Sequence, residues 1–188
     1  ALSFDGVDDY IPSVPGYNLN NQAFSVEFWA KRRSTVNELV FAQGSIGFNI
    51  GLQIGFFGSS PLFGFYSNDL MANYAFDTQW HHWAYVYNSA LPGINRFIYR
   101  DGVLILSDHA NGNYVGSGNA IIGDAVWGSN KLNSTLDELR IWNVARSQCQ
   151  IQQYMNCEIT STLAGLTGNY HFNQGIPSGT NTGVTTLI

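Results

Sequence analysis

Two stretches decide the fold: Ala1-Leu-Ser-Phe-Asp-Gly-Val-Asp-Asp-Tyr-Ile11 and, far along the chain, Leu136-Asp-Glu-Leu-Arg-Ile-Trp-Asn143. Each stretch alternates apolar and polar residues, which is the pattern of a half-buried β-strand. Each also carries acidic residues where a strand would meet a turn. We therefore predict a strand near each end of the domain.

The segments between them repeat this β pattern at short intervals. The runs 24–31 and 80–88 alternate strictly, and Asp101-Gly102 separates two β-rich runs between residues 96 and 106. Asp-Gly favours a type I′ hairpin, whose turn needs positive φ at both central residues. Helical spacing occurs only at 145–155, which predicts one short helix near 146–155.

Length and composition suit one large β domain. The 188 residues are 45% hydrophobic and 14% aromatic, but only 11% charged, against about 25% in typical soluble domains. We predict a single all-β domain over residues 1–188, a two-sheet antiparallel β-sandwich, with the Gly- and Thr-rich segment 175–188 as a linker or edge strand. A net charge of −5 argues against nucleic-acid binding. The absence of an apolar run of about 18 residues argues against membrane insertion.

Further motifs support a family resemblance. The segments Trp80-His-His-Trp-Ala84, Ile98-Tyr-Arg-Asp-Gly-Val103 and Gly168-Asn-Tyr-His-Phe-Asn-Gln-Gly175 follow one another in order. With the two end stretches, they resemble a laminin G-like, pentraxin-like domain of the concanavalin A-like lectin/glucanase superfamily. The resemblance implies a jelly roll whose first strand (about 2–4) pairs antiparallel with the closing strand (about 136–142). It also implies a secreted or cell-surface location, within a larger multidomain protein.

The function implied by the resemblance is non-catalytic binding of a glycan or polysaccharide, or adhesion. One alternative is a structural or protein-interaction module that binds no sugar, since fold alone does not determine function. A second alternative, a glycoside hydrolase or lyase, needs two carboxylates about 5 Å apart in one cleft. The adjacent residues Asp137 and Glu138 are expected to face opposite sides of a strand. The pattern therefore does not favour an enzyme.

The two neighbouring histidines are expected to be structural. His81 and His82 are adjacent in a strand, so their rings point to opposite faces and do not chelate one ion together. We expect one imidazole inside the sandwich and the other facing outward.

Calcium is the expected cofactor. The turn Asp5-Gly-Val-Asp8 offers carboxylate and carbonyl oxygens, which Ca²⁺ prefers. The resemblance implies a structural calcium held between the first and closing strands, with Asp5, a backbone oxygen near Gly6, and Asp137 at the matching positions. We predict an ion bound by Asp5 or Asp8 together with Asp137. The alternative is an Asx-type turn without an ion.

A saccharide site requires aromatic surfaces beside polar hydrogen-bonding groups. We predict Trp127 and Asn130, in a loop rich in turn residues, together with Tyr74 and Asn73. The small residue Gly128 beside Trp127 predicts an exposed ring. The alternative is that Trp127 caps one end of the sandwich.

The two cysteines leave two alternatives. In a continuous helix Cys149 and Cys157 would lie about 12 Å apart, beyond the roughly 7 Å limit for a disulfide. If the helix ends near Tyr154, the chain can fold back and close the bond. A disulfide and two buried thiols both remain possible.

Overall fold

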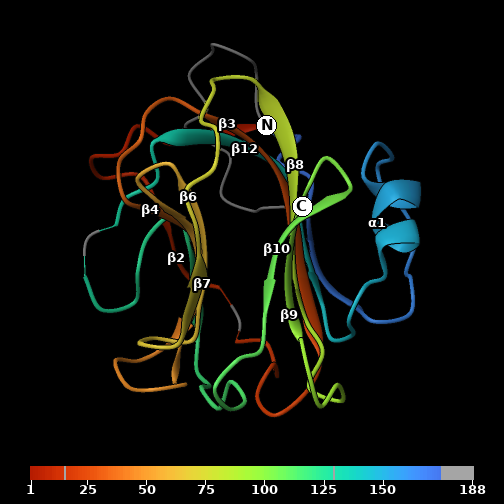
Figure 1. The fold of residues 1–188 in the computed structure, drawn as a ribbon. Coiled ribbons are helices and arrows are strands. Elements are labelled where there is room, and N and C mark those ends of the chain that lie inside the picture. The colour runs from red at the N-terminus through yellow and green to blue at the C-terminus, as the bar shows by residue number, and fades with distance from the viewer. Residues whose placement is uncertain (15, 129, 175–188) are drawn as a thin grey trace.

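Two antiparallel β-sheets face each other in the computed structural model, which describes residues 1–14, 16–128 and 130–174 (Figure 1). Sheet A has the order β1-β12-β3-β8-β9-β10, with β13 also paired to β12, and sheet B has the order β2-β11-β4-β5-β6-β7. The predicted two-sheet antiparallel sandwich is confirmed. The segment predicted as a linker or edge strand, 175–188, lies outside the described residues.

The strands of sheet A are β1 (Leu2–Ser3), β3 (Phe24–Arg32), β8 (Trp80–Tyr87), β9 (Arg96–Arg100), β10 (Val103–Asp108), β12 (Ser134–Trp142) and β13 (Leu166–Tyr170). The strands of sheet B are β2 (Ile11–Val14), β4 (Glu38–Gly44), β5 (Gly51–Phe57), β6 (Ser60–Gly64), β7 (Asp69–Met71) and β11 (Ala120–Ile122).

The two ends of the sequence meet as predicted. Strand β1 pairs antiparallel with β12, with Leu2 opposite Leu136. Phe4, Leu139 and Ile141 are fully or almost fully buried, and Leu2 is partly buried against the same core. The alternation in the two end stretches therefore does aim their apolar residues at the space between the sheets.

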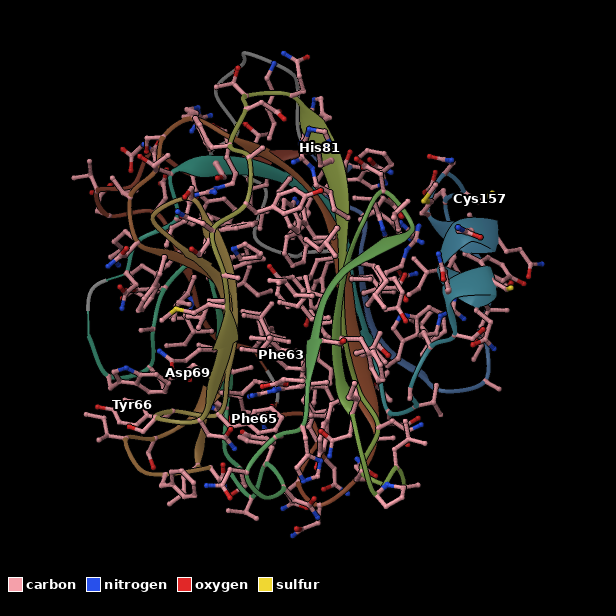
Figure 2. All side chains as sticks on the ribbon, viewed as in Figure 1. Phe63, Phe65, Tyr66, Asp69, His81 and Cys157 are labelled. Atoms are coloured by element: carbon pink, nitrogen blue, oxygen red, sulfur yellow. The ribbon has the colours of Figure 1, made fainter. Side chains whose placement is uncertain are left out.

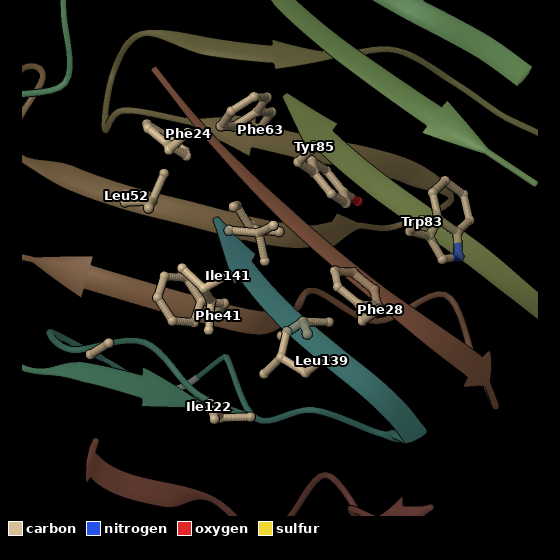
Figure 3. Close-up of a cluster of buried hydrophobic side chains, with 14 of the residues drawn as sticks. Phe24, Phe28, Phe41, Leu52, Phe63, Trp83, Tyr85, Ile122, Leu139 and Ile141 are labelled. Carbon is tan, nitrogen blue, oxygen red and sulfur yellow. The ribbon is translucent and has the colours of Figure 1, made fainter. Parts of the chain in front are cut away.

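Aromatic side chains fill that space (Figure 3). On β3, Phe24 and Phe28 are fully buried, as the alternation predicts. The ring of Phe28 stacks on that of Tyr85 from β8, with centroids 5.8 Å apart. Buried aromatic residues contribute large apolar areas and prefer offset or edge-on contacts, so this core strongly stabilises the sandwich.

The predicted hairpin and helix are both present. Asp101 and Gly102 join β9 to β10 with φ of 52° and 71°, the positive values that a type I′ turn requires. Helix α1 (Gln148–Tyr154) begins after Ser147, whose side chain accepts a hydrogen bond from the amide of Gln150 in a capping box. No helix in the described ranges is long and apolar enough to cross a membrane.

Helix α1 lies on the outer face of sheet A, away from sheet B (Figure 1). Its buried residue Ile151 packs on Ala84, Val86 and Tyr99 of that face. Strands β3 and β8 are consequently covered on both faces, and polar residues on their outer face are buried beneath the helix.

Candidate functional site

A pocket of about 490 Å³ opens on the outer face of sheet A, beside the C-terminal end of α1. Cys157, which lines the pocket, lies next to α1 on this outer side in Figure 2. The pocket combines two indole rings, three carboxylates and two amides. The full lining is Trp29, Trp80, Asp137, Glu138, Met155, Asn156, Cys157, Glu158 and Asn173.

A β-bulge in β12 places two adjacent carboxylates in this pocket. The pairing of β12 with β3 shifts register between Asp137 and Arg140, and Glu138 has a φ of 49°. A left-handed residue in a bulge breaks the alternation of a strand and redirects its side chains. The expectation that Asp137 and Glu138 face opposite sides is therefore wrong, because both line one pocket.

The buried guanidinium of Arg140 connects the bulge to the helix. Its Nη2 donates to Glu138 Oε2 at 2.7 Å and also to the carbonyl oxygen of Cys157, while Nη1 donates to the carbonyl oxygen of Tyr154 at 2.8 Å. The last carbonyls of a helix lack partners within the helix, and a cation there is favourable. Arg140 thus fixes the chain after α1, which forms one wall of the pocket.

The two tryptophans come from alternating positions on neighbouring strands. Trp29 is opposite His82 in the pairing of β3 with β8, and its Nε1 donates to the carbonyl oxygen of Met155 at 2.7 Å. Trp80 begins β8 and is 38% exposed. Neither tryptophan is among the ligand-binding residues predicted from the sequence. A signal was nevertheless present in the sequence. The alternation of each strand places its tryptophan on the face of the sheet that points away from the core.

A buried polar layer forms the floor beneath α1. The Glu27 carboxylate accepts from Arg146 Nε at 3.1 Å, and the same guanidinium lies 3.9 Å above the ring of Trp142. Burial raises the pKa of Glu27, although Arg146 and Arg140 oppose that change. Burial, reinforced by the same two arginines, lowers the pKa of His82 to about 3.

The positions of the two histidines correct one expectation. His82 is the buried imidazole, but it lies between sheet A and α1 rather than between the two sheets. His81 is on the opposite face of β8, where its ring nitrogens lie 2.6 Å from Asp101 Oδ2 and 2.9 Å from Asp77 Oδ1. The opposite orientation of the two rings is as predicted.

Trp127 is partly buried, so the expectation of an exposed ring is wrong. Its indole contacts the ring of Tyr66 edge-on at 5.5 Å and covers Gly51 so closely that an added Cβ would lie 2.8 Å from it. The loop is held by Asp124, whose Oδ1 accepts from the backbone amide of Asn130 at 3.0 Å. Tyr66 lies in the turn between β6 and β7, and Gly51 begins β5. Both are distant from Trp127 in sequence, which is why loop composition did not reveal these contacts.

Tyr74 and Asn73 lie at the other end of the sandwich. Tyr74 packs partly buried against Trp83, with centroids 6.4 Å apart, and Asn73 Oδ1 accepts from Ser59 at 2.8 Å. Figure 2 shows His81, at the start of β8, and Tyr66, the neighbour of Trp127, at opposite ends of the molecule. The structure therefore does not bring the four predicted ligand-binding residues into one site.

The acidic turn near the N-terminus assembles three carboxylates. Single oxygens of Asp5, Asp8 and Asp9 lie within 4.8 Å of one another, and all three residues are exposed. Asp5 Oδ1 accepts from the amides of Val7 and Asp8, an Asx-type turn, and these bonds lower the pKa of Asp5. Oxygen donors of this kind suit Ca²⁺.

Asp137 is not part of this cluster. Because Leu2 is opposite Leu136, position 137 aligns with Ala1, and Asp5 lies four positions further along, roughly 13 Å away. Asp137 Oδ1 is instead 3.5 Å from the backbone nitrogen of Ala1. The predicted sharing of one ion between Asp5 or Asp8 and Asp137 is therefore wrong for this register.

Both cysteines are free and exposed, so neither alternative for them holds. Cys149 lies in the first turn of α1, and Cys157 follows the helix, with its amide donating to the carbonyl oxygen of Tyr154. The hydrogen bonds after Tyr154 hold Cys157 at the pocket instead of folding it back toward Cys149.

Residues 5–152 match the Laminin_G_3 family, described as the concanavalin A-like lectin/glucanases superfamily. The chain belongs to this family. No curated protein matches this laminin G-like chain significantly.

Solved structures share the laminin G-like fold. A candidate carbohydrate-binding protein from Bacteroides ovatus has a TM-score of 0.70 and 18% identity, over 90% of this chain and 50% of that one. Domain 4 of AbnA, an extracellular GH43 arabinanase from Geobacillus stearothermophilus in complex with arabinotriose, has a TM-score of 0.61 and 21% identity, over 80% of this chain and 74% of that one. The binding domain of botulinum neurotoxin DC in complex with SialylT has a TM-score of 0.52 and 18% identity, over 72% of this chain and 35% of that one.

The laminin G-like chain thus spans half the length of the first of these structures and about a third of the last. At these identities the likeness shows the fold alone.

We expect the buried His82 to make stability depend on pH. Its folded pKa is about 3, against about 6.5 when unfolded, so between these values the unfolded chain binds the extra proton. The contribution of His82 to the free energy of unfolding is fully present above pH 6.5. It falls as the pH decreases, by up to about 1.4 kcal/mol per pH unit. Urea unfolding between about pH 7 and pH 5 should show a smaller decrease in His82→Gln than in the parent protein.

The matched control is His109→Gln, since His109 is exposed. It should keep the pH dependence of the parent. An identical pH dependence in the parent protein and in His82→Gln would contradict a neutral buried imidazole.

Proposed function

We propose that this chain is a non-catalytic carbohydrate-binding module of a larger secreted protein, and that its site is the pocket beside α1. The observation that carries the proposal is the combination of two indole rings with carboxylate and amide groups in one pocket. Aromatic faces and convergent polar groups are what sugar recognition requires. Two of the similar solved structures, a candidate carbohydrate-binding protein and an arabinanase domain in complex with arabinotriose, support the same class.

The state of the pocket carboxylates supports the non-catalytic part of the proposal. Oxygens of Glu138 and Glu158 lie within 4.8 Å of each other, a separation compatible with glycoside hydrolysis. However, Glu138 Oε2 is bonded to Arg140, and Oε1 lies 2.9 Å from His171 Nδ1. A carboxylate engaged on both oxygens is poorly suited to attack a sugar or protonate a leaving group.

Substitution of Trp80 tests the site. We expect Trp80→Ala to weaken binding of the best ligand on a glycan array about tenfold or more. Aromatic stacking contributes about 1 kcal/mol in addition to the burial of apolar area, and a loss of 1.4 kcal/mol in binding free energy raises Kd tenfold. Because Trp80 is 38% exposed, the thermal midpoint of the Trp80→Ala protein should differ little from that of the parent protein. Isothermal titration calorimetry measures the affinity.

Trp127→Ala is the matched control. It should keep the affinity and lower the thermal midpoint, because the ring packs on Tyr66 and Gly51. Loss of affinity in Trp127→Ala alone would move the site to the loop around Trp127. An array with no bound glycan would favour the structural or protein-interaction alternative.

We also propose that Ca²⁺ binds the turn formed by Asp5, Asp8 and Asp9, and stabilises the folded state. A ligand that binds only the folded state adds about 2.7 kcal/mol at 100 times its Kd. Adding Ca²⁺ should therefore raise the thermal midpoint of the parent protein and of Asp137→Asn, but not of Asp8→Asn. An equal midpoint with Ca²⁺ and with chelator in the parent protein would refute the site.

A further inference from the structure

The pocket beside α1 has a strongly acidic lining. Three of its lining residues are carboxylates, Asp137, Glu138 and Glu158, and none of the described residues that line it is basic. The basic side chains in contact with these carboxylates are Arg140 and His171. Arg140 is buried behind Glu138, so it does not present positive charge to a ligand in the pocket.

Two of the carboxylates retain acceptor capacity. Asp137 Oδ1 accepts from the amide of Glu138 at 3.1 Å, and Glu158 Oε1 accepts from Asn173 Nδ2 at 3.2 Å. In the described part of the chain, no hydrogen bond to Asp137 Oδ2 or Glu158 Oε2 is present. Their side chains are 33% and 51% exposed, so a ligand can reach both.

Trp80 adds an aromatic face at the same pocket. An indole face attracts a cation through its quadrupole and also packs on the C–H face of a sugar ring. Lys31, the cross-strand neighbour of Trp80, is exposed and lies outside the pocket lining. An indole beside carboxylates that each keep one oxygen available to a ligand suits a ligand that carries both a sugar ring and a positive charge.

We propose that the pocket selects glycans with unacetylated amino sugars, whose protonated amine is held by Asp137 and Glu158 while the sugar ring stacks on Trp80. This inference rests on the proposed carbohydrate-binding function and names its ligand class. A protonated amine donates up to three hydrogen bonds, and a charge-assisted bond to a carboxylate is stronger than a neutral one. A uronic or sialic acid would instead bring its own carboxylate against three others.

The test compares oligosaccharides of equal length by isothermal titration calorimetry. The ligands are oligomers of glucosamine, of N-acetylglucosamine and of galacturonate. We expect the cationic oligomer to bind at least tenfold more tightly than the neutral one, and the anionic oligomer not to bind. Raising ionic strength toward about 1 M, where the Debye length is about 3 Å, should weaken the cationic oligomer selectively.

Three variants separate charge recognition from stacking. Asp137→Asn and Glu158→Gln should each reduce the preference for the cationic over the neutral oligomer, whereas Trp80→Ala should weaken both oligomers. Glu158 is more than half exposed, so its substitution keeps the test valid even if Asp137→Asn alters the fold. Thermal melts of each variant report on folding.

The outcomes distinguish this inference from the function on which it rests. Equal affinity for the cationic and neutral oligomers, lost in Trp80→Ala, would overturn the amino-sugar preference and retain the carbohydrate-binding function. Binding of no oligosaccharide would overturn both. Binding of an oligolysine of matched charge as tightly as the glucosamine oligomer would show recognition of charge alone, and would also overturn the inference.

Discussion

The guanidinium of Arg140 is the interaction on which the outer face of the sandwich depends. It is 1% exposed and joins three groups: the Glu138 carboxylate at the β12 bulge and the carbonyl oxygens of Tyr154 and Cys157 beyond α1. A buried charge is costly unless it is paired and hydrogen-bonded, so the bulge and the chain after the helix constrain each other. Together they form two walls of the pocket.

Sheet A therefore serves two purposes on its two faces. Facing sheet B, Phe24 and Phe28 of β3 contribute to an aromatic core of ordinary hydrophobic character. Facing α1, the same strand contributes Ser25, Glu27 and Trp29, which bond to groups in or near the helix. Ser25 Oγ, Trp29 Nε1 and Glu27 Oε1 find hydrogen-bond partners there, which allows a strand with alternating polarity to be buried on both sides.

The sequence predicted the fold well because its signals are local or periodic. Alternation identified β3 and β8, Asp101-Gly102 identified the hairpin, and the pairing of the two end strands followed from the family resemblance. The site could not be predicted in the same way. Alternation assumes a regular strand, and the left-handed Glu138 breaks it. Trp127 looked exposed because its neighbours, Tyr66 and Gly51, are distant in sequence.

Ligand binding in the pocket beside α1, which Trp29 and Trp80 line, is tested most directly by the indole N–H resonances. The chain has five tryptophans, so a ¹H–¹⁵N spectrum should resolve five indole signals that single substitutions assign. On titration with a bound glycan, we expect the signals of Trp80 and Trp29 to shift and those of Trp127 and the buried Trp142 to stay in place. A shift of the Trp127 signal with no change at Trp80 would contradict binding in this pocket.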